Sequence, residues 1–416
     1  MSNKIKIFTI GDHPLSPSGV GTQTKYMIEA MLKTGKYEFV SFGGAISHPD
    51  HNPQHTEEWG TDWVIWPVDG YGSQDMVRAM IEQQKPDILW FMTDPRFYGW
   101  LWAIDNEVRD KVPMVYYHVW DNWPAPRFNK PSYDANDHIA CISQVTYNIV
   151  KEVSPDLDIS YLPHAVDDNV FRPLDPEMVT QMRKQHGLED KFVVFWNSRN
   201  ARRKQSGTLI WWFKEFLDQI GHENGVLVMH TDTKDVHGQD LDAIVQELGL
   251  MGGQVRFSRN KVSPQDLNLF YNMADITACI SDAEGFGLST LESMTAGTPI
   301  LVNMTGGLKD QVTDGENWFG VGLTPASKAI IGSQEVPYIY EDRLHKEDFL
   351  EGITKLYEMG PDERQALGIK ARQWSQDMFG FEKFANSWDE LFTKIYNEKG
   401  SWKTRKGFSP YEVRTF

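Results

Sequence analysis

Residues 281–302 read SDAEGFGLSTLESMTAGTPILV, and this stretch decides how the chain is interpreted. The apolar run at 275–281 predicts a strand, and the spacing after it predicts a helix over 288–296. Gly285 and Gly287 flank Phe286, so the backbone can approach an anion and direct N–H groups at it from a helix N-terminus. An ordinary glycine turn is the plainer alternative, but the glycines followed by AGTP favour an anion-binding loop.

Two carboxylates frame this loop, Glu284 and Glu292, eight residues apart. Glu284 is expected before the helix begins and Glu292 within it. The spacing predicts that they serve different parts of one extended ligand.

Short apolar segments alternate with helical patterns along the whole chain. Strands are expected at 5–10, 37–42, 63–68, 87–92, 113–119, 138–143 and 159–164, and again at 191–198, 225–231, 254–258, 275–281 and 298–303. Helices are expected at 22–36, 73–84, 206–220 and 263–274. Continuous apolar strands alternating with helices indicate parallel sheets covered on both faces. This alternation begins again after the polar stretch around Pro173 and Pro176, which predicts two α/β domains in series with a cleft between them.

A basic cluster in NSRNARRKQSG, residues 197–207, follows the strand at 191–198. A solvated helix start is the plain alternative, but the helix dipole disfavours cations there. A diphosphate leaving group needs such charges, so Arg199 and Lys204 are predicted to bind it. Arg202 and Arg203 are expected to face solvent.

Three weaker signals lie in the first half of the chain. Gly19 and Gly21 form a G-x-G turn after the first strand, without the third glycine of a dinucleotide fingerprint. His118 closes a strand at the sheet edge where ligands bind, and a structural histidine is an equal alternative. His164 is expected in a turn.

The composition limits the function classes. The 416 residues include 41 Lys plus Arg against 58 Asp plus Glu, a net charge of −17, which argues against a general polyanion binder. Cys141 and Cys279 give neither a disulfide framework nor a metal cluster. With no apolar stretch near the ~20 residues that span a bilayer, a cytoplasmic protein is expected. The basic segment around Arg405 is expected to be a solvated end.

Together these segments resemble glycosyltransferase family 4, the retaining, nucleotide-sugar-dependent enzymes with the GT-B fold. The resemblance is strongest over 159–321 and includes PHAVDDNVF at 163–171 and the pair Gly306-Gly307. It implies an α/β, GT-B fold with two Rossmann-like domains facing across a cleft. The expected domains are an acceptor-side domain, 1–170, with a C-terminal helix at 381–416 packing back on it, and a nucleotide-sugar domain, 171–380.

The resemblance also implies roles for the residues. Arg199 and Lys204 would hold the diphosphate, Glu284 would bind a sugar hydroxyl and face the transition-state charge, and His118 would lie beside the sugar. The remaining donor contacts would come from Gly19, Gly21, Gly285, Phe286, Gly287, Leu288 and Glu292, the last of these on the ribose.

The implied reaction is metal-independent sugar transfer with retention, using a nucleoside-diphosphate sugar as donor and no cofactor. The acceptor stays open: a glycan, a lipid-linked sugar, a small molecule or a modified DNA base. The oligomeric state is also open. Rival interpretations are a transferase acting on modified bases in DNA, a nucleotide-sugar epimerase, and a non-catalytic sugar-nucleotide binder.

Three features depart from the family pattern, the mildest being SMTAG at 293–297 in place of an alanine-rich helix. The stretch 324–343 is longer than usual and is open to acceptor, oligomer or loop roles. The first domain is rich in tryptophan, for which core packing is favoured over ligand stacking; these residues are Trp100, Trp102, Trp120 and Trp123.

Overall fold

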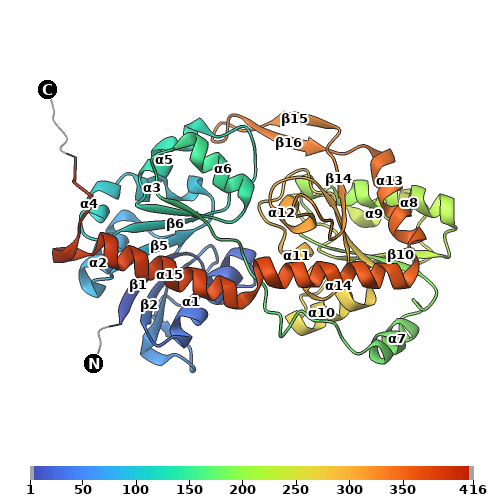
Figure 1. Cartoon of the computed structure of the whole chain (residues 1–416), viewed down its shortest axis with the longest axis horizontal. Coiled ribbons are helices and arrows are strands. Elements are labelled where there is room, and N and C mark those ends of the chain that lie inside the picture. Colours follow the sequence, from blue (N-terminus) through green and yellow to red (C-terminus); the bar gives the residue numbers. More distant parts are fainter. Residues whose placement is uncertain (1–3, 412–416) are drawn as a thin grey trace. The chain divides into compact units, whose positions relative to one another are not determined.

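The computed structural model describes residues 4–411 and forms two compact units (Figure 1). Unit 1 comprises residues 1–164 and 382–416, and unit 2 comprises 165–381. The domain limits expected from the sequence, 1–170 with 381–416 and 171–380, stay predictions. Each unit is an α/β structure built on a largely parallel sheet.

Unit 1 contains an eight-stranded sheet in the order β3-β4-β2-β1-β5-β6-β7-β8. All neighbours pair in parallel except β3, which runs antiparallel to β4. The strands are β1 Ile5–Asp12, β2 Tyr37–Gly44, β3 Gln54–His55, β4 Trp63–Pro67, β5 Ile88–Met92, β6 Met114–His118, β7 His138–Cys141 and β8 Ile159–Tyr161. Apart from the short β3, each lies where an apolar segment predicted a strand.

Helices cover both faces of this sheet, which explains the nearly continuous apolar strands. They are α1 Gly19–Lys33, α2 Gln74–Gln84, α3 Gly99–Trp102, α4 Asp105–Arg109, α5 Lys130–Asp134, α6 Gln144–Val153 and α15 Phe381–Lys399. On the α15 face, the Trp388 ring lies 5.9 Å from Trp90 and 4.9 Å from Tyr117. On the opposite face Trp102 packs in the core, 5.3 Å from Phe91.

Unit 2 contains a six-stranded parallel sheet in the order β11-β10-β9-β12-β13-β14. The strands are β9 Phe192–Asn197, β10 Gly225–His230, β11 Val255–Ser258, β12 Ile276–Cys279, β13 Ile300–Asn303 and β14 Val321–Leu323. The helices are α7 Pro176–Gln185, α8 Ser206–Ile220, α9 Leu241–Glu247, α10 Pro264–Met273, α11 Leu288–Thr295, α12 Leu308–Val312, α13 Lys346–Glu358 and α14 Gly360–Phe379.

Two apolar clusters hold this sheet between its helices. On one face α8, α9 and α13 bury residues such as Phe213 and Phe349 against the strands. On the other face α11, α12 and α14 bury Met294, Leu308 and Ala371. None of the helices in the described range 4–411 is long and apolar enough to span a membrane.

The long stretch 324–343 forms an antiparallel hairpin, β15 Ser327–Ile331 and β16 Ile339–Arg343. Ala329 pairs with Glu341 in its register. The insertion is therefore ordered secondary structure within unit 2.

The expectation that the basic end around Arg405 is solvated is wrong. The Arg405 guanidinium donates to Asp137 Oδ1 at 2.6 Å, and the side chains are only 4% and 2% exposed. The short helix η5 (Trp402–Thr404) anchors this turn, since the Trp402 indole donates to the Pro86 carbonyl. The sequence shows that this segment is basic, but it does not show that Arg405 pairs with the buried Asp137.

Replacing Arg405 with Ala should lower the free energy of unfolding by about 3 kcal/mol, because it leaves Asp137 buried without its main partner. Urea denaturation followed by tryptophan fluorescence measures this change. Lys403→Ala, an exposed neighbour, is the control and should shift stability by less than about 0.5 kcal/mol. Equal effects from both variants would contradict the buried ion pair.

Candidate functional site

The basic cluster (residues 199–204) and the loop at 284–287, here called the glycine loop, both lie at the carboxyl edge of the unit 2 sheet. The cluster follows β9, and Glu284 follows β12, the strand next to β9. The Lys204 ammonium donates to Glu284 Oε2, and the two side chains are only 12% and 14% exposed. Arg203 Nη1 lies 3.6 Å from the same oxygen. Two residues predicted to be catalytic are thus in direct contact.

Glu284 remains a carboxylate in this setting. Burial acts to raise its pKa, but the positive charges of Lys204 and Arg203 outweigh burial, and the net pKa lies below the ordinary value. The pair places one positive and one negative group side by side in a mostly buried position.

Two consecutive glycines, Gly306 and Gly307, pack directly against the backbone of the loop that carries Glu284. Gly306 has φ +49°, and a Cβ there would lie 1.7 Å from the Glu284 carbonyl oxygen. The Gly307 N–H donates to that carbonyl at 3.1 Å, and a Cβ on Gly307 would lie 2.6 Å from the Gly285 carbonyl oxygen. Only glycine at both positions allows this backbone contact.

One side chain of α12, Gln311, donates hydrogen bonds to two carbonyl groups of the loop. Gln311 Nε2 donates to the carbonyls of Phe286 and Gly287 at 2.8 and 3.0 Å, and Gln311 Oε1 accepts from Thr290. Gly287, with φ +92°, precedes the first residue of α11, Leu288, where the sequence predicted the helix to begin. The first-turn N–H groups of α11 have no partner within the helix, so this end favours an anion.

The remaining arginines of the cluster all have partners. Arg199 pairs with Asp235 at 2.6 and 3.1 Å. Arg202 donates both Nη groups to Glu341 on β16, at 2.9 and 2.5 Å. Arg202 and Arg203 face solvent as expected, with side chains 57% and 39% exposed, and each also has a carboxylate partner.

The hairpin extends this network to the glycine loop. Arg343 bridges Glu341 and Asp282, at 2.9 and 2.8 Å. The Gln205 amide also donates to Asp282 at 2.6 Å. Burial raises the pKa of Asp282 to about 6, although Gln205 and Arg343 act in the opposite direction.

These supporting residues had no clear signal in the sequence. Glu341 and Arg343 lie in the unusual insertion, and Asp235 lies in an unremarkable polar loop. Of the residues that fix the loop, only Gly306 and Gly307 were noted in the sequence, as part of the resemblance to the family.

Glu292, on the buried side of α11, belongs to a second set of contacts. The Tyr271 hydroxyl donates to Glu292 Oε2 at 2.6 Å, and Asn197 Nδ2 donates to that hydroxyl at 3.0 Å. Burial raises the pKa of Glu292 to about 7, although the hydrogen bond from Tyr271 acts in the opposite direction. Glu284 and Glu292 thus have separate partners.

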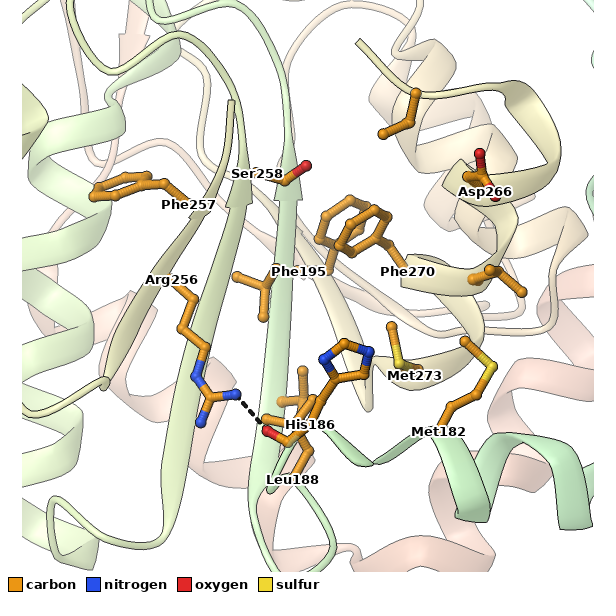
Figure 2. A pocket seen from close by; sticks show the side chains of 14 residues that line it. Met182, His186, Leu188, Phe195, Arg256, Phe257, Ser258, Asp266, Phe270 and Met273 are labelled. Carbon is orange, nitrogen blue, oxygen red and sulfur yellow. Dashed lines mark hydrogen bonds between the residues drawn. The ribbon is translucent and has the colours of Figure 1, made fainter. Parts of the chain in front are cut away.

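A pocket of about 500 Å³ lies on the sheet face beside this second set (Figure 2). Phe195 and Phe270 stack in it with ring centroids 5.4 Å apart, and Phe195 also contacts the Tyr271 ring at 5.1 Å. Ser258 lies at one end of the pocket, and at the other end Arg256 donates to the His186 carbonyl. The pocket is apolar with polar groups at both ends, so it suits a flat ring.

In unit 1 the predicted glycine turn is part of a helix. Gly19 and Gly21 lie in the first turn of α1, capped by Ser18, rather than in a loop before a helix that begins at residue 22. A Cβ on Gly21 would lie 2.7 Å from the His13 carbonyl oxygen, so packing against the preceding loop requires glycine. The sequence missed the start because glycines are poor helix formers, whereas the Ser18 cap supports the first turn.

His118 is fully buried at the end of β6. Its Nε2 bonds to the Tyr133 hydroxyl at 2.8 Å, and its ring stacks on Trp120 with centroids 6.3 Å apart. Burial lowers its pKa to about 3, so the ring is neutral. Its predicted contact with a sugar stays a prediction. His164, also buried, bonds to the Tyr117 hydroxyl at 2.7 Å.

Comparison with known proteins shows what the chain resembles. Residues 178–374 match the family described as Glycosyl transferases group 1. Mannosylfructose-phosphate synthase of Agrobacterium fabrum is 31% identical, over 45% of this chain and 41% of that protein. The GDP-mannose-dependent alpha-(1-6)-phosphatidylinositol monomannoside mannosyltransferase of Mycolicibacterium smegmatis is 28% identical, over 43% of this chain and 47% of that protein. The chain thus spans about half the length of the curated relatives it matches.

Solved structures match nearly the whole chain. Sucrose-phosphate synthase from Thermosynechococcus elongatus has a TM-score of 0.74 at 17% identity, covering 95% of this chain and all of that one (100%). Anabaena HepE in complex with UDP and glucose has a TM-score of 0.69 at 16% identity, covering 94% and 100%. The predicted fold class and family are confirmed. Residues 178–374, within the second unit, thus carry a Glycosyl transferases group 1 domain, and the chain as a whole has the GT-B fold and resembles glycosyltransferase family 4.

Proposed function

We propose that the protein transfers a sugar from a nucleoside-diphosphate sugar to an acceptor with retention of the anomeric configuration. The observation that carries the proposal is the contact of Lys204 with Glu284 beside the N-terminus of α11. A group for the leaving phosphate and a group for the reacting sugar are thereby adjacent. The relatives named for GDP-mannose and the HepE complex with UDP and glucose support a nucleotide-sugar donor.

The diphosphate is proposed to bind at the N-terminus of α11, between Lys204 and Arg199. The helix end and the lysine supply positive potential where negative charge develops as the bond to the sugar breaks. When the donor binds, Lys204 leaves Glu284 and contacts the phosphate. Arg199 likewise leaves Asp235 and contacts the phosphate. We infer that these groups act without a metal ion and that no further cofactor takes part.

Glu284 is proposed to accept a hydrogen bond from a donor-sugar hydroxyl. Its low pKa keeps it negative, so it also favours the positive charge that forms on the sugar ring. The departing phosphate is proposed to take the acceptor's proton on the same face of the sugar, which gives retention.

The nucleoside end is proposed to lie along the Tyr271–Glu292 contact. Glu292 would accept hydrogen bonds from the ribose hydroxyls, and the base would enter the end of the Phe195–Phe270 pocket nearest Ser258. The aromatic lining favours stacking of a planar base.

A thermal-shift panel of nucleotides and nucleotide sugars tests the proposal, since a donor stabilises the folded protein by mass action. The stabilising donor is then incubated with acceptors, and proton NMR of the product gives its anomeric configuration. An inverted product excludes retention, and a changed nucleotide sugar formed without acceptor indicates an epimerase.

Lys204→Ala should lower kcat by about 10²–10³-fold, because one group that stabilises the leaving phosphate is lost. Steady-state rates with the donor found in the panel measure it. Lys214→Ala removes a lysine that pairs with Asp218 on α8 and is the control. A kcat close to that of the unaltered protein would contradict the role of Lys204.

Glu292→Gln and Glu284→Gln should separate binding from turnover. Because the pKa of Glu292 is about 7, the carboxylate is lost as pH falls below 7, and nucleoside diphosphate affinity should fall with it. Glu292→Gln should weaken affinity and abolish this pH dependence, as calorimetry at pH 6 and 8 would show. Glu284→Gln should mainly lower kcat. If Glu292→Gln instead lowered kcat and Glu284→Gln weakened affinity, Glu284 would bind the ribose and Glu292 the sugar.

Glu341→Gln tests the support given by the hairpin. Losing the charge loosens Arg202, two residues before Lys204, so kcat should fall about tenfold with little change in donor affinity. Glu335→Gln, at the exposed tip of the same hairpin, is the control. A lower melting temperature with unchanged kcat would mean that Glu341 serves stability alone.

A further inference from the structure

One end of the pocket in Figure 2 takes no part in the proposed reaction, and this end carries an arginine. The base is proposed to lie at the Ser258 end, whereas Arg256 and His186 lie at the opposite end. Every residue that lines the pocket belongs to unit 2. The chemistry of this end can therefore be argued from unit 2 alone.

The positive charge of Arg256 has no carboxylate partner within residues 4–411. Its Nη1 donates to the His186 carbonyl at 2.6 Å, and its Nε donates to the Gly253 carbonyl at 3.2 Å. In the same described range, Nη2 has no hydrogen-bond partner. A half-buried guanidinium with N–H groups to spare favours an anion. One unpaired positive charge matches a group with one negative charge, such as a carboxylate.

The pocket wall near this end is aliphatic and adaptable. Met182, Leu188 and Met273 lie near His186 in Figure 2. Methionine side chains are unbranched and adjust to the shape of what they contact. Such a wall gains stability by burying methylene groups and offers no polar group to a sugar or peptide. It therefore favours an unbranched hydrocarbon chain.

Helix α10 gives the length of the pocket and the charge at its far end. Asp266 and Met273 both line the pocket and are seven residues apart on α10, which is about 10 Å along the helix axis. An extended octanoate chain has a similar length. The Asp266 carboxylate, which accepts from the Ser263 hydroxyl at 2.8 Å, repels an anionic group there. The charges therefore place an anionic head at the Arg256 end.

We propose that this pocket binds a medium-chain aliphatic carboxylate, with its head on Arg256 and its chain between α10 and strands β9 to β11. The site goes beyond the proposed function, because sugar transfer does not require such a ligand. A chain that fills the pocket reaches the Ser258 end, so the carboxylate should compete with a nucleoside diphosphate whose base lies there.

Calorimetry of the full chain with hexanoate, octanoate and octylammonium tests the site. Octanoate should bind about 15-fold more tightly than hexanoate, because two more methylene groups are buried. Octylammonium has the same chain with the opposite charge and should bind at least about tenfold more weakly than octanoate. Non-specific attraction to a protein of net charge −17 favours the ammonium, so a preference for the carboxylate indicates a local positive group.

Arg256→Gln should weaken octanoate binding about tenfold, because it removes the charge that meets the head. Arg259→Gln is the matched control. Arg259 pairs with Asp242 and does not line this pocket, so octanoate affinity should stay unchanged. Melting temperatures show whether both variants are folded. The comparison of octanoate with octylammonium uses the unaltered protein and needs neither variant.

Equal affinities for octanoate and octylammonium would overturn the inference, as would the absence of octanoate binding or of any gain over hexanoate. Unchanged octanoate affinity in folded Arg256→Gln would also overturn it.

Titration of UDP and GDP into the same samples keeps the two proposals apart. Octanoate binding without nucleotide binding supports this site and rejects the proposed function. Nucleotide binding without octanoate binding rejects this site alone. Octanoate that binds without weakening nucleotide binding supports the site and contradicts the proposed position of the base.

Discussion

A buried carboxylate held in its charged form is the interaction on which the candidate site depends. Glu284 sits in a mostly buried position, where burial alone would favour its protonated form, and Lys204 and Arg203 reverse that preference. The same contact fixes the position of the Lys204 ammonium, which we propose binds the leaving phosphate. A site that must stabilise positive charge on a sugar and negative charge on a phosphate needs both signs within a few ångströms.

This pair is positioned from several directions by parts of unit 2 that are distant in sequence. Gly306 and Gly307 fix the backbone of the glycine loop, and Gln311 donates hydrogen bonds to the carbonyls of Phe286 and Gly287. The β15–β16 hairpin supplies Glu341, which binds Arg202 in the basic cluster. The insertion thus supports the site from its base, whatever its exposed tip does.

The sequence was sufficient for the parts that depend on local pattern. Apolar runs identified the main strands of both sheets, and the glycines with Glu284 and Lys204 identified the loop and the basic cluster. Partners that meet only in three dimensions were not accessible: Glu341 and Asp235 are ordinary polar residues in sequence, and Arg405 reads as a solvated end although it is buried against Asp137. The first turn of α1 was missed because its glycines oppose helix formation locally, whereas packing requires them.

We propose that the N-terminus of α11, with Lys204, binds a diphosphate. Calorimetric comparison of UDP with UMP, and of GDP with GMP, tests this most directly. We expect the diphosphate of the preferred base to bind at least about tenfold more tightly than the monophosphate, because the second phosphate contacts the helix end and the lysine. Equal affinities for the diphosphate and the monophosphate would contradict it.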